Sequence, residues 1–170
     1  MKASDIGKMT LYRHFPSKDE LIVAFLRHKD REFWEYFEQS TKDAPTARAK
    51  LLAFFEALQQ YVLSPACYGC PFINVASEYP EVEYVGHQVA LEHKQSVRVR
   101  FTQLAQEAGT RRPEALANAL LLLMDGAYMA ARMYGAAPSN PASTVVEAAR
   151  QVIDAHCEAQ ECAAGEKEQH

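Results

Sequence analysis

Two cysteines, Cys67 and Cys70, stand close together in a short stretch that also holds proline and glycine. Thiols separated by two residues can close a disulfide or supply half of a zinc site. The remaining thiols, Cys157 and Cys162, lie far along the chain at a looser spacing, and Asn74 rather than a histidine stands just downstream. We therefore predict no metal site, a packed Cys70 and an exposed Cys67. The alternative function is that of an all-helical redox-active or small-molecule-binding protein that uses this pair.

The histidines have no companions that would complete a catalytic site. His28, His87 and His93 stand in no Ser-His-Asp arrangement, and the sequence contains no phosphate-binding glycine loop and no His-Glu-x-x-His string. The first of these patterns pairs a nucleophile with a base, the second holds a phosphate group, and the third binds a catalytic metal ion. Without them, we predict a protein that is not an enzyme and that uses no cofactor. His87, on a predicted long helix, remains a candidate for lining a pocket.

The most specific string in the sequence is GKMTLYRHFPSKDEL, residues 7–21. In its first part, Leu11 and Phe15 are four residues apart and can anchor one face of a short helix. A proline follows, and Ser17 with Glu20 forms a capping box that predicts the start of a new helix. A short helix with a polar outer face and an anchored inner face fits the major groove of DNA. The competing interpretation is a solvated helix pair with an aromatic anchor.

This string resembles the end of the helix-turn-helix unit in the TetR/AcrR family of transcriptional regulators, where Thr-Leu-Tyr-x-His-Phe is followed at once by Ser-Lys-x-Glu-Leu. The resemblance implies that base edges are contacted by Lys8, Met9 and Thr10, and phosphates by Tyr12, His14 and Lys18. It also implies about two further helices before this string. We therefore expect the 170-residue chain alone to bind operator DNA weakly, and specific binding to need those helices.

A second string, GCPFINVASEYP at residues 69–80, resembles a segment common in the regulatory domain of one branch of the same family. The resemblance implies a domain that holds a small apolar or aromatic effector between its helices. Such a pocket needs aromatic walls and a few polar groups. The candidate pocket residues are Phe55, Tyr61, Phe72, Asn74, Tyr84, His87, Met124 and Tyr128. Ordinary core packing is the competing interpretation for the aromatic ones.

The composition favours one folded body with a basic end. Of the 170 residues, 48% are apolar, and the net charge of −4 argues against a surface that binds nucleic acid throughout. Residues 1–18 nevertheless hold four lysines or arginines against one acid. No apolar run reaches the length of a membrane span, and the N-terminus lacks the apolar core of a secretory signal. We therefore expect a cytoplasmic protein that makes no membrane contact.

Apolar residues recur at the helical period over nearly the whole chain, so the sequence predicts an all-α fold. Prolines, glycines and capping residues divide it into predicted helices at 17–42, 46–64, 72–78, 80–106, 113–135 and 142–158. We interpret residues 1–16 as the end of a helix-turn-helix DNA-binding domain and 17–42 as a connecting long helix. Residues 43–162 are then a ligand-binding and dimerisation domain, and 163–170 a disordered tail.

The last two predicted helices each carry an apolar face, and such faces need a cover. In the family that the chain resembles, these helices form a four-helix dimer bundle, whose twofold axis matches a palindromic double-stranded DNA operator. The predicted interface residues are Leu116, Leu120, Leu123, Ala127, Val145, Ala149, Val152 and Ile153. Asp125 lies within this apolar stretch and needs a partner, for which Arg132 or a residue of a second subunit is expected.

Overall fold

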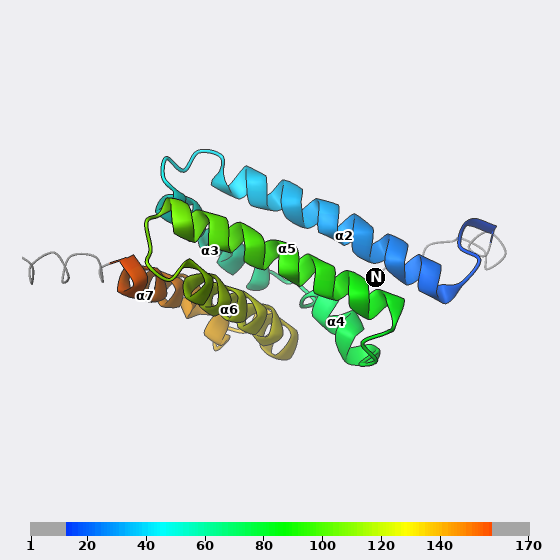
Figure 1. Ribbon diagram of the computed structural model, residues 1–170. Coiled ribbons are helices and arrows are strands. Elements are labelled where there is room, and N and C mark those ends of the chain that lie inside the picture. Colours follow the sequence, from blue (N-terminus) through cyan, green and yellow to red (C-terminus); the bar gives the residue numbers. More distant parts are fainter. Residues whose placement is uncertain (1–12, 158–170) are drawn as a thin grey trace, which may run out of the picture.

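The computed structural model describes residues 13–157, which are all-helical and contain no strand (Figure 1). The all-α fold predicted from the sequence is thereby confirmed. The elements are α2 (Lys18–Thr41), α3 (Ala47–Val62), α4 (Pro71–Glu78), α5 (Val85–Glu107), α6 (Pro113–Tyr134), the 3-10 turn η1 (Pro141–Thr144) and α7 (Val145–Cys157). Within the described part of the chain, no helix is both long and apolar enough to cross a membrane.

Local capping chemistry fixes where several helices begin. The Ser17 side chain accepts a hydrogen bond from the Glu20 N–H at 3.1 Å, and the Thr46 side chain accepts one from the Ala49 N–H at 3.1 Å. Each bond satisfies an N–H group that the first helical turn leaves unpaired, and such caps typically contribute about 1 kcal/mol. Both starts were predicted from the sequence and are confirmed. Prolines occupy the first positions of α4 and α6, where a missing N–H costs nothing.

The start of α5 differs from the prediction. Pro80 was expected to open this helix, but α5 begins at Val85, and residues 79–84 form a loop. Within the loop the Tyr84 N–H donates to the Glu81 carbonyl at 3.0 Å, and the Tyr84 hydroxyl donates to Asp19 Oδ1 at 2.9 Å. This contact to a residue far away in the sequence holds a turn that apolar periodicity does not register.

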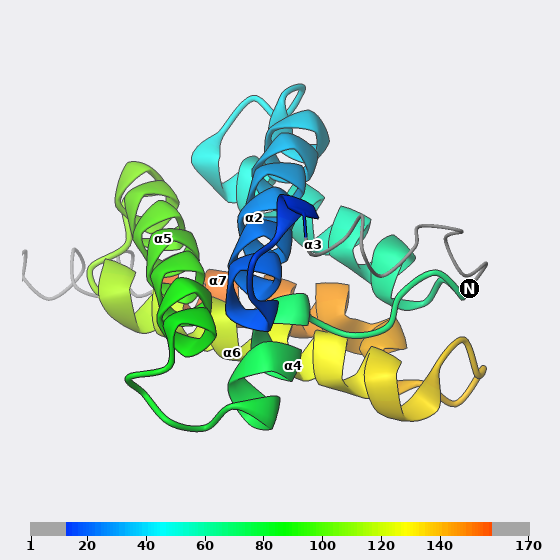
Figure 2. The same cartoon turned by 90° about the vertical axis from the view of Figure 1, so that its right-hand side faces the viewer.

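The helices pack around a core of phenylalanine rings. Phe37, Phe54, Phe55 and Phe101 have no exposed surface, and their neighbouring ring centroids lie 5.0–6.5 Å apart. Burying each ring stabilises the fold by roughly 1.5–3 kcal/mol. α2 and α5 run alongside each other, and α6 and α7 lie on the opposite side of the molecule from α2, with α6 packed against α5 and α7 packed against α3 and α6 (Figures 1 and 2). The start of α2 lies at the opposite end of the molecule from the end of α7 (Figure 1).

Gly86 lets three helices approach closely near the start of α2. A Cβ atom at this position would lie 2.7 Å from the Tyr84 ring and 3.1 Å from methyl groups of Ile22 and Val75. Those residues belong to the loop before α5, to α2 and to α4. The first turn of α5 therefore packs directly against the other two helices only because position 86 has no side chain.

Candidate functional site

A cavity of about 220 Å³ lies between α2, α3, α4, α5 and α6. Its walls are mostly aromatic or apolar, as is usual for sites that bind small molecules. It is lined by Lys29, Glu32, Phe33, Tyr36, Tyr61, Cys70, Pro71, Phe72, His93, Lys94, Met124 and Tyr128. The cavity therefore collects side chains that the sequence distributes over about 100 residues.

Four of the eight predicted pocket residues line this cavity: Tyr61, Phe72, Met124 and Tyr128. The other four do not. Phe55 is fully buried among the rings of the core, so it supports the cavity from behind rather than facing it. The sequence correctly places Phe55 on the inward face of its helix, but its side chain packs against Phe54 and Phe101 and not against the cavity.

The remaining three predicted pocket residues lie on α4 (Asn74), in the loop before α5 (Tyr84) and in the first turn of α5 (His87). The Asn74 amide donates to the Tyr68 carbonyl at 3.4 Å, and Tyr84 bonds Asp19. The His87 Nδ1 atom lies 3.1 Å from the Tyr79 carbonyl oxygen. These contacts follow from the late start of α5, which turns its first residues toward α4 and α2. None of the three lines the cavity described above, although His87 lines a smaller neighbouring hollow together with Phe72 and Lys94, so their predicted role in ligand binding stays a prediction.

His93 forms part of the inner wall and was not among the predicted pocket residues. Its ring stacks on Phe72 with centroids 3.6 Å apart and planes inclined by 4°, and the edge of Phe33 meets it at 4.8 Å. Burial lowers the pKa of His93 to about 4, although the hydrogen bond to Asp30 opposes this shift. The ring is therefore neutral at pH 7. Its Nδ1–H donates to Asp30 Oδ1 at 2.7 Å, which links α5 to α2 and leaves Nε2 as an acceptor.

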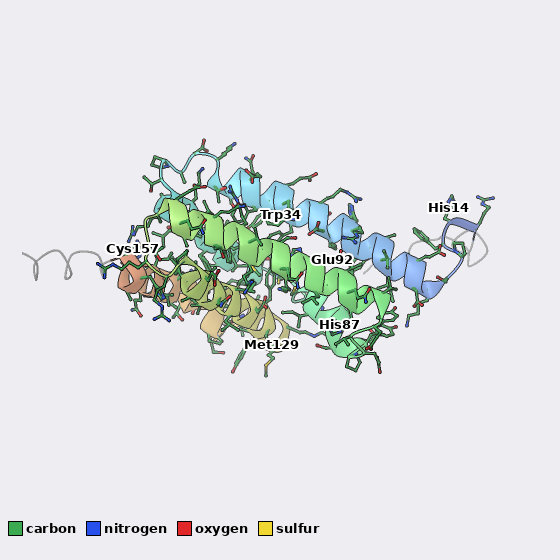
Figure 3. All side chains as sticks on the ribbon, viewed as in Figure 1. His14, Trp34, His87, Glu92, Met129 and Cys157 are labelled. Atoms are coloured by element: carbon green, nitrogen blue, oxygen red, sulfur yellow. The ribbon has the colours of Figure 1, made fainter. Side chains whose placement is uncertain are left out.

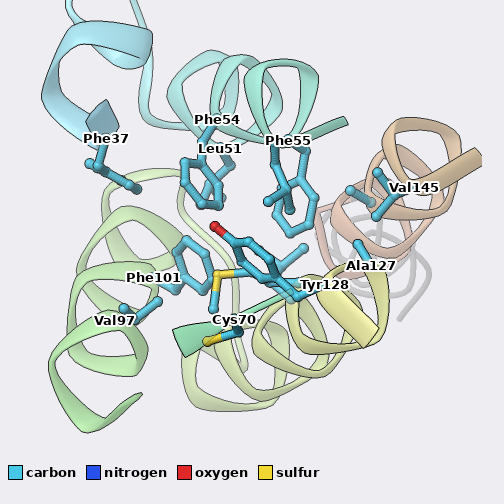
Figure 4. Packing of buried hydrophobic residues seen from close by; sticks show 14 of the residues in the cluster. Phe37, Leu51, Phe54, Phe55, Cys70, Val97, Phe101, Ala127, Tyr128 and Val145 are labelled. Carbon is cyan, nitrogen blue, oxygen red and sulfur yellow. The ribbon is translucent and has the colours of Figure 1, made fainter. Parts of the chain in front are cut away.

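Three tyrosines form the opposite wall. The rings of Tyr36 and Tyr61 have centroids 6.2 Å apart, and those of Tyr61 and Tyr128 are also 6.2 Å apart. Tyr128 extends from α6 toward the rings of α3 and α5, beside Cys70 (Figure 4). Burial raises the pKa of all three phenols, so their hydroxyls are neutral hydrogen-bonding groups at pH 7. Spacing alone gave no signal for Tyr36, which lies on the predicted connecting helix.

Each ammonium group at the cavity is paired with an acid. Lys29 Nζ donates to Glu32 Oε2 at 2.6 Å, and Lys94 forms an ion pair with Asp125. The sequence correctly indicated that Asp125 needs a partner, but the expected partner, Arg132, instead donates to the Tyr68 carbonyl at 3.3 Å. Lys94 lies on α5, which packs along α6, so the pairing crosses a helix contact that sequence spacing does not show.

The cysteine pair lies at the base of the cavity, around the start of α4. Cys70 is 4% exposed and lines the cavity. Cys67 is 6% exposed, so the prediction that it is exposed is wrong: the loop folds back against the end of α6, with Gly69 at a positive φ of 86°. Both thiols are free, and burial raises the pKa of Cys67. Within residues 13–157 no group of three or more His, Cys, Asp or Glu side chains could hold a metal ion.

The predicted DNA-binding residues fall at the start of α2 or before it. Lys8, Met9, Thr10 and Tyr12 lie outside the described residues. His14 is exposed at one extremity of the molecule (Figure 3). Lys18 is also exposed, but its Nζ atom lies 3.7 Å from Glu78 Oε1 and 5.1 Å from the centroid of the Tyr79 ring.

The interface prediction needs correction, because six of its eight residues are already covered inside one protomer. Leu116, Leu120, Ala127, Val145, Ala149 and Ile153 are at most 5% exposed. Their apolar faces pack α6 and α7 against the protomer's own core, so they cannot form a contact surface. Only Leu123 and Val152 reach the surface in part.

Another apolar face of α6 is open. Leu122 and Met133 are each 73% exposed and Met129 is 41% exposed, and Met129 projects from the outer side of α6 (Figure 3). These residues belong to a stripe that recurs every seven positions in two series, as in a coiled-coil seam. We call it the α6 stripe: Ala115, Ala119, Leu122, Gly126, Met129 and Met133. At its centre, a Cβ atom on Gly126 would meet nothing within 4 Å.

Comparison with known proteins identifies relatives of the chain by sequence and by fold. A family model described as the tetracycline-repressor-like C-terminal domain matches residues 47–146. The HTH-type transcriptional regulator YjdC of Escherichia coli (strain K12) and that of Shigella flexneri are each 27% identical to the chain over 117 residues, or 68% of its length. The matched region spans 61% of these relatives, which is less than two thirds of their length.

Solved structures show the same fold. SCO4454, a TetR-family transcriptional regulator from Streptomyces coelicolor, superposes with a TM-score of 0.82 at 28% identity, covering 89% of this chain and 79% of that one. A putative TetR transcriptional regulator from Streptomyces avermitilis, sav143, gives a TM-score of 0.76 at 28% identity, with 89% and 81% covered. Since the domain model matches more than half of the 170 residues and the folds coincide, the chain belongs to the TetR family of transcriptional regulators.

Proposed function

We propose that this TetR-family protein is an effector-responsive repressor that binds a palindromic operator as a homodimer in the cytoplasm. The cavity is the effector site, and the residues from Lys8 to Lys18 are the DNA contacts, completed by the helices that precede them in related proteins. Residues 17–42 connect this DNA-binding part to a ligand-binding and dimerisation domain. An effector acts by favouring a protomer geometry in which the two recognition helices no longer fit successive major grooves.

The observation that carries this proposal is the position of α4. At its first turn, Phe72 lines the cavity and Cys70 immediately precedes it. At its other end, Glu78 and Tyr79 contact Lys18, the first residue of α2. α4 is only eight residues long, so a compound that displaces Phe72 acts about two turns away from the helix that leads to the DNA contacts.

A second contact strengthens the same connection. The rings of Tyr79 and Tyr84 stack with centroids 4.3 Å apart, and the Tyr84 hydroxyl donates to Asp19 at 2.9 Å. Burial and this hydrogen bond raise the pKa of Tyr84 to about 12, so the donor stays protonated over the physiological range. The first turn of α2 is therefore held by the loop that follows α4, in addition to its covalent link to the DNA-binding part.

The α6 stripe supports the dimer. Its exposed methionines and leucine would be an unfavourable surface for a monomer, and Gly126 at its centre permits close approach of a second α6. A twofold axis through such a stripe makes each subunit present the same surface to the other. With the twofold axis parallel to α6, the two copies of α2 start at the same end of the dimer, as a palindromic operator requires.

The test is operator binding by the chain carrying a complete helix-turn-helix unit, measured by fluorescence anisotropy on a palindrome selected from a random duplex pool and on a scrambled duplex. We expect tight binding to the palindrome that weakens with salt, and Thr10→Ala should reduce the preference between the two duplexes. Arg111→Ala, an exposed cation in the α5–α6 connection at the opposite end, is the control and should change neither. Equal affinity for both duplexes, or equal effects of the two variants, would contradict the proposal.

A further inference from the structure

The cavity contains polar groups that no contact within the described chain satisfies. The Tyr128 side chain is 8% exposed, and its hydroxyl forms no hydrogen bond with any of residues 13–157. The hydroxyls of Tyr36 and Tyr61, which also line the cavity, likewise form no hydrogen bond within residues 13–157, but Tyr36 is half-buried and Tyr61 is 38% exposed. Within residues 13–157 no fully buried side-chain polar atom lacks a hydrogen-bond partner, so these hydroxyls keep contact with solvent in the cavity, and a ligand that displaces this solvent must supply hydrogen bonds in its place. A phenol hydroxyl can accept a hydrogen bond and donates one, and an acceptor atom on the ligand is needed to use that donor.

The charges at the cavity argue against a charged ligand. Lys29 and Lys94 are already paired with Glu32 and Asp125, and His93 is neutral. An anionic ligand would therefore have to break an existing ion pair to find its counter-charge. A cationic ligand would find Glu32, the one carboxylate among the described residues that line the cavity, already paired with Lys29 and His28. In either case a charge would be buried without compensation.

The shape of the walls selects a flat molecule. Phe72 and His93 stack face to face in the lining, and the three tyrosine rings, inclined to one another by 53° and 71°, also line the cavity, so a flat aromatic ligand finds ring faces and edges to pack against. A cavity of about 150 Å³ between apolar side chains is enough to hold benzene. With about 220 Å³, this cavity has room for one aromatic ring with small substituents.

We infer that the cavity takes a neutral, planar aromatic compound with a carbonyl oxygen that accepts a hydrogen bond from Tyr128. Tyr61 and Tyr36 are the further donors, and the ring of the ligand packs against the aromatic side chains that line the cavity. This inference rests on the proposal that the cavity is the effector site, and it specifies the chemical class of the effector. Metals, phosphates and nucleotides do not fit these walls, since all of them bring charge.

The experiment compares three probes of nearly the same shape by isothermal titration calorimetry on the 170-residue chain. Para-methylacetophenone is neutral, para-toluate is an anion and para-methylbenzylammonium is a cation. We expect the neutral ketone to bind, and each charged probe to bind at least about tenfold more weakly. Tyr128→Phe keeps the ring and removes the donor, so it should weaken ketone binding by about three- to tenfold. Tyr61→Phe should weaken it in the same direction.

The matched control is Tyr134→Phe, which removes an exposed hydroxyl from the same helix and should leave the affinity unchanged. The inference is overturned if a charged probe binds as tightly as the ketone, if Tyr128→Phe behaves like Tyr134→Phe, or if no probe binds the folded chain. If the ketone binds as expected but leaves operator affinity unchanged, the ligand class stands and the repressor proposal fails.

Discussion

At the residue scale, the inner wall of the cavity depends most on His93. This side chain is 4% exposed, its ring is held between Phe72 and Phe33, and its Nδ1–H donates to Asp30 on α2. A buried imidazole with one carboxylate neighbour could be charged or neutral, and here the loss of hydration dominates over the attraction to Asp30. The neutral ring stacks on Phe72 and adds no unpaired charge to the cavity, whose lysines are already paired with acids.

This neutrality predicts a pH dependence of stability. The pKa of His93 is lowered from 6.5 to about 4 in the folded chain. As the pH falls below about 6.5, the unfolded chain takes up a proton that the folded chain binds only near pH 4, so stability is lost over this window. The difference between the two pKa values corresponds to about 3 kcal/mol. Replacing His93 with Phe keeps an aromatic ring against Phe72 and removes this titration.

Urea unfolding of the wild type and of His93→Phe at several values between pH 4 and pH 7 measures the effect. The wild type should lose more stability than the variant as the pH falls through this range. His28→Gln changes an exposed histidine on α2 and should leave the wild-type pH dependence in place. Parallel curves for the wild type and His93→Phe would show that His93 is not the buried neutral group described above.

The candidate site was predictable from the sequence only in part, and the reason differs from residue to residue. Tyr61, Phe72, Met124 and Tyr128 were found because aromatic or flexible apolar residues on inward faces are the usual lining of a pocket. Periodicity identifies an inward face but not what lies opposite, and so Phe55 was assigned to the cavity although it packs against other rings. The partners of His93 and Lys94 lie on other helices, which no local spacing reveals.

At the element scale, α6 has two apolar faces, of which one is buried in the protomer core and the other is open. One face, with Leu116 and Leu120, is fully buried in the protomer core. The other is the α6 stripe, which is exposed in one protomer and follows the coiled-coil period. The sequence indicates that α6 is apolar on several sides, but it does not separate the face that packs internally from the one that remains open. That separation comes from the positions of α3, α5 and α7.

The α6 stripe predicts the effect of a single charge on assembly. Leu122→Glu should convert a dimer into a monomer, because two copies of the carboxylate would face each other near the twofold axis without partners. One protomer should fold equally well with this change, since Leu122 is 73% exposed. Size-exclusion chromatography with light scattering should give twice the 19.1 kDa chain mass for the wild type and the single chain mass for the variant.

Val99→Glu is the matched control for this experiment, because Val99 is 53% exposed on α5, outside the stripe. It should remain dimeric. If the Leu122→Glu chain keeps the dimer mass, the interface lies elsewhere on the protein. If the wild type has the mass of a single chain, the proposed dimer is contradicted.

Most element boundaries were predictable because their causes are local. The Ser17 and Thr46 caps, the prolines that open α4 and α6, and Gly135 with its positive φ after α6 all act within one turn of their own position. The start of α5 was not, since its loop is held by the bond from Tyr84 to Asp19 on another helix. Local sequence patterns therefore predict most helix boundaries, whereas the candidate site depends on contacts between helices, which local patterns do not reveal.

At the scale of the whole molecule, the cavity and the start of α2 are joined by α4 and the loop that follows it. Phe72 lies at one end of this connection, and Lys18 and Asp19 lie at the other, held by Tyr79 and Tyr84. The pair of His93 and Asp30 adds a direct link from the cavity wall to the middle of α2. A ligand can shift the DNA-binding equilibrium only if it binds the two geometries of this connection with different affinity.

The most direct test of this account is the reciprocity between effector and operator. Calorimetry should measure the affinity of a cavity ligand, identified by its sensitivity to Tyr128→Phe, for the chain with a complete helix-turn-helix unit, free and saturated with operator. The account predicts that operator weakens ligand binding by about fivefold or more, and that the ligand weakens operator binding by the same factor. Tyr84→Phe, which removes the bond to Asp19, should shrink this factor without changing ligand affinity in the free protein. Identical ligand affinities with and without operator would contradict the account, because they would show that the cavity and the DNA-facing end are not coupled.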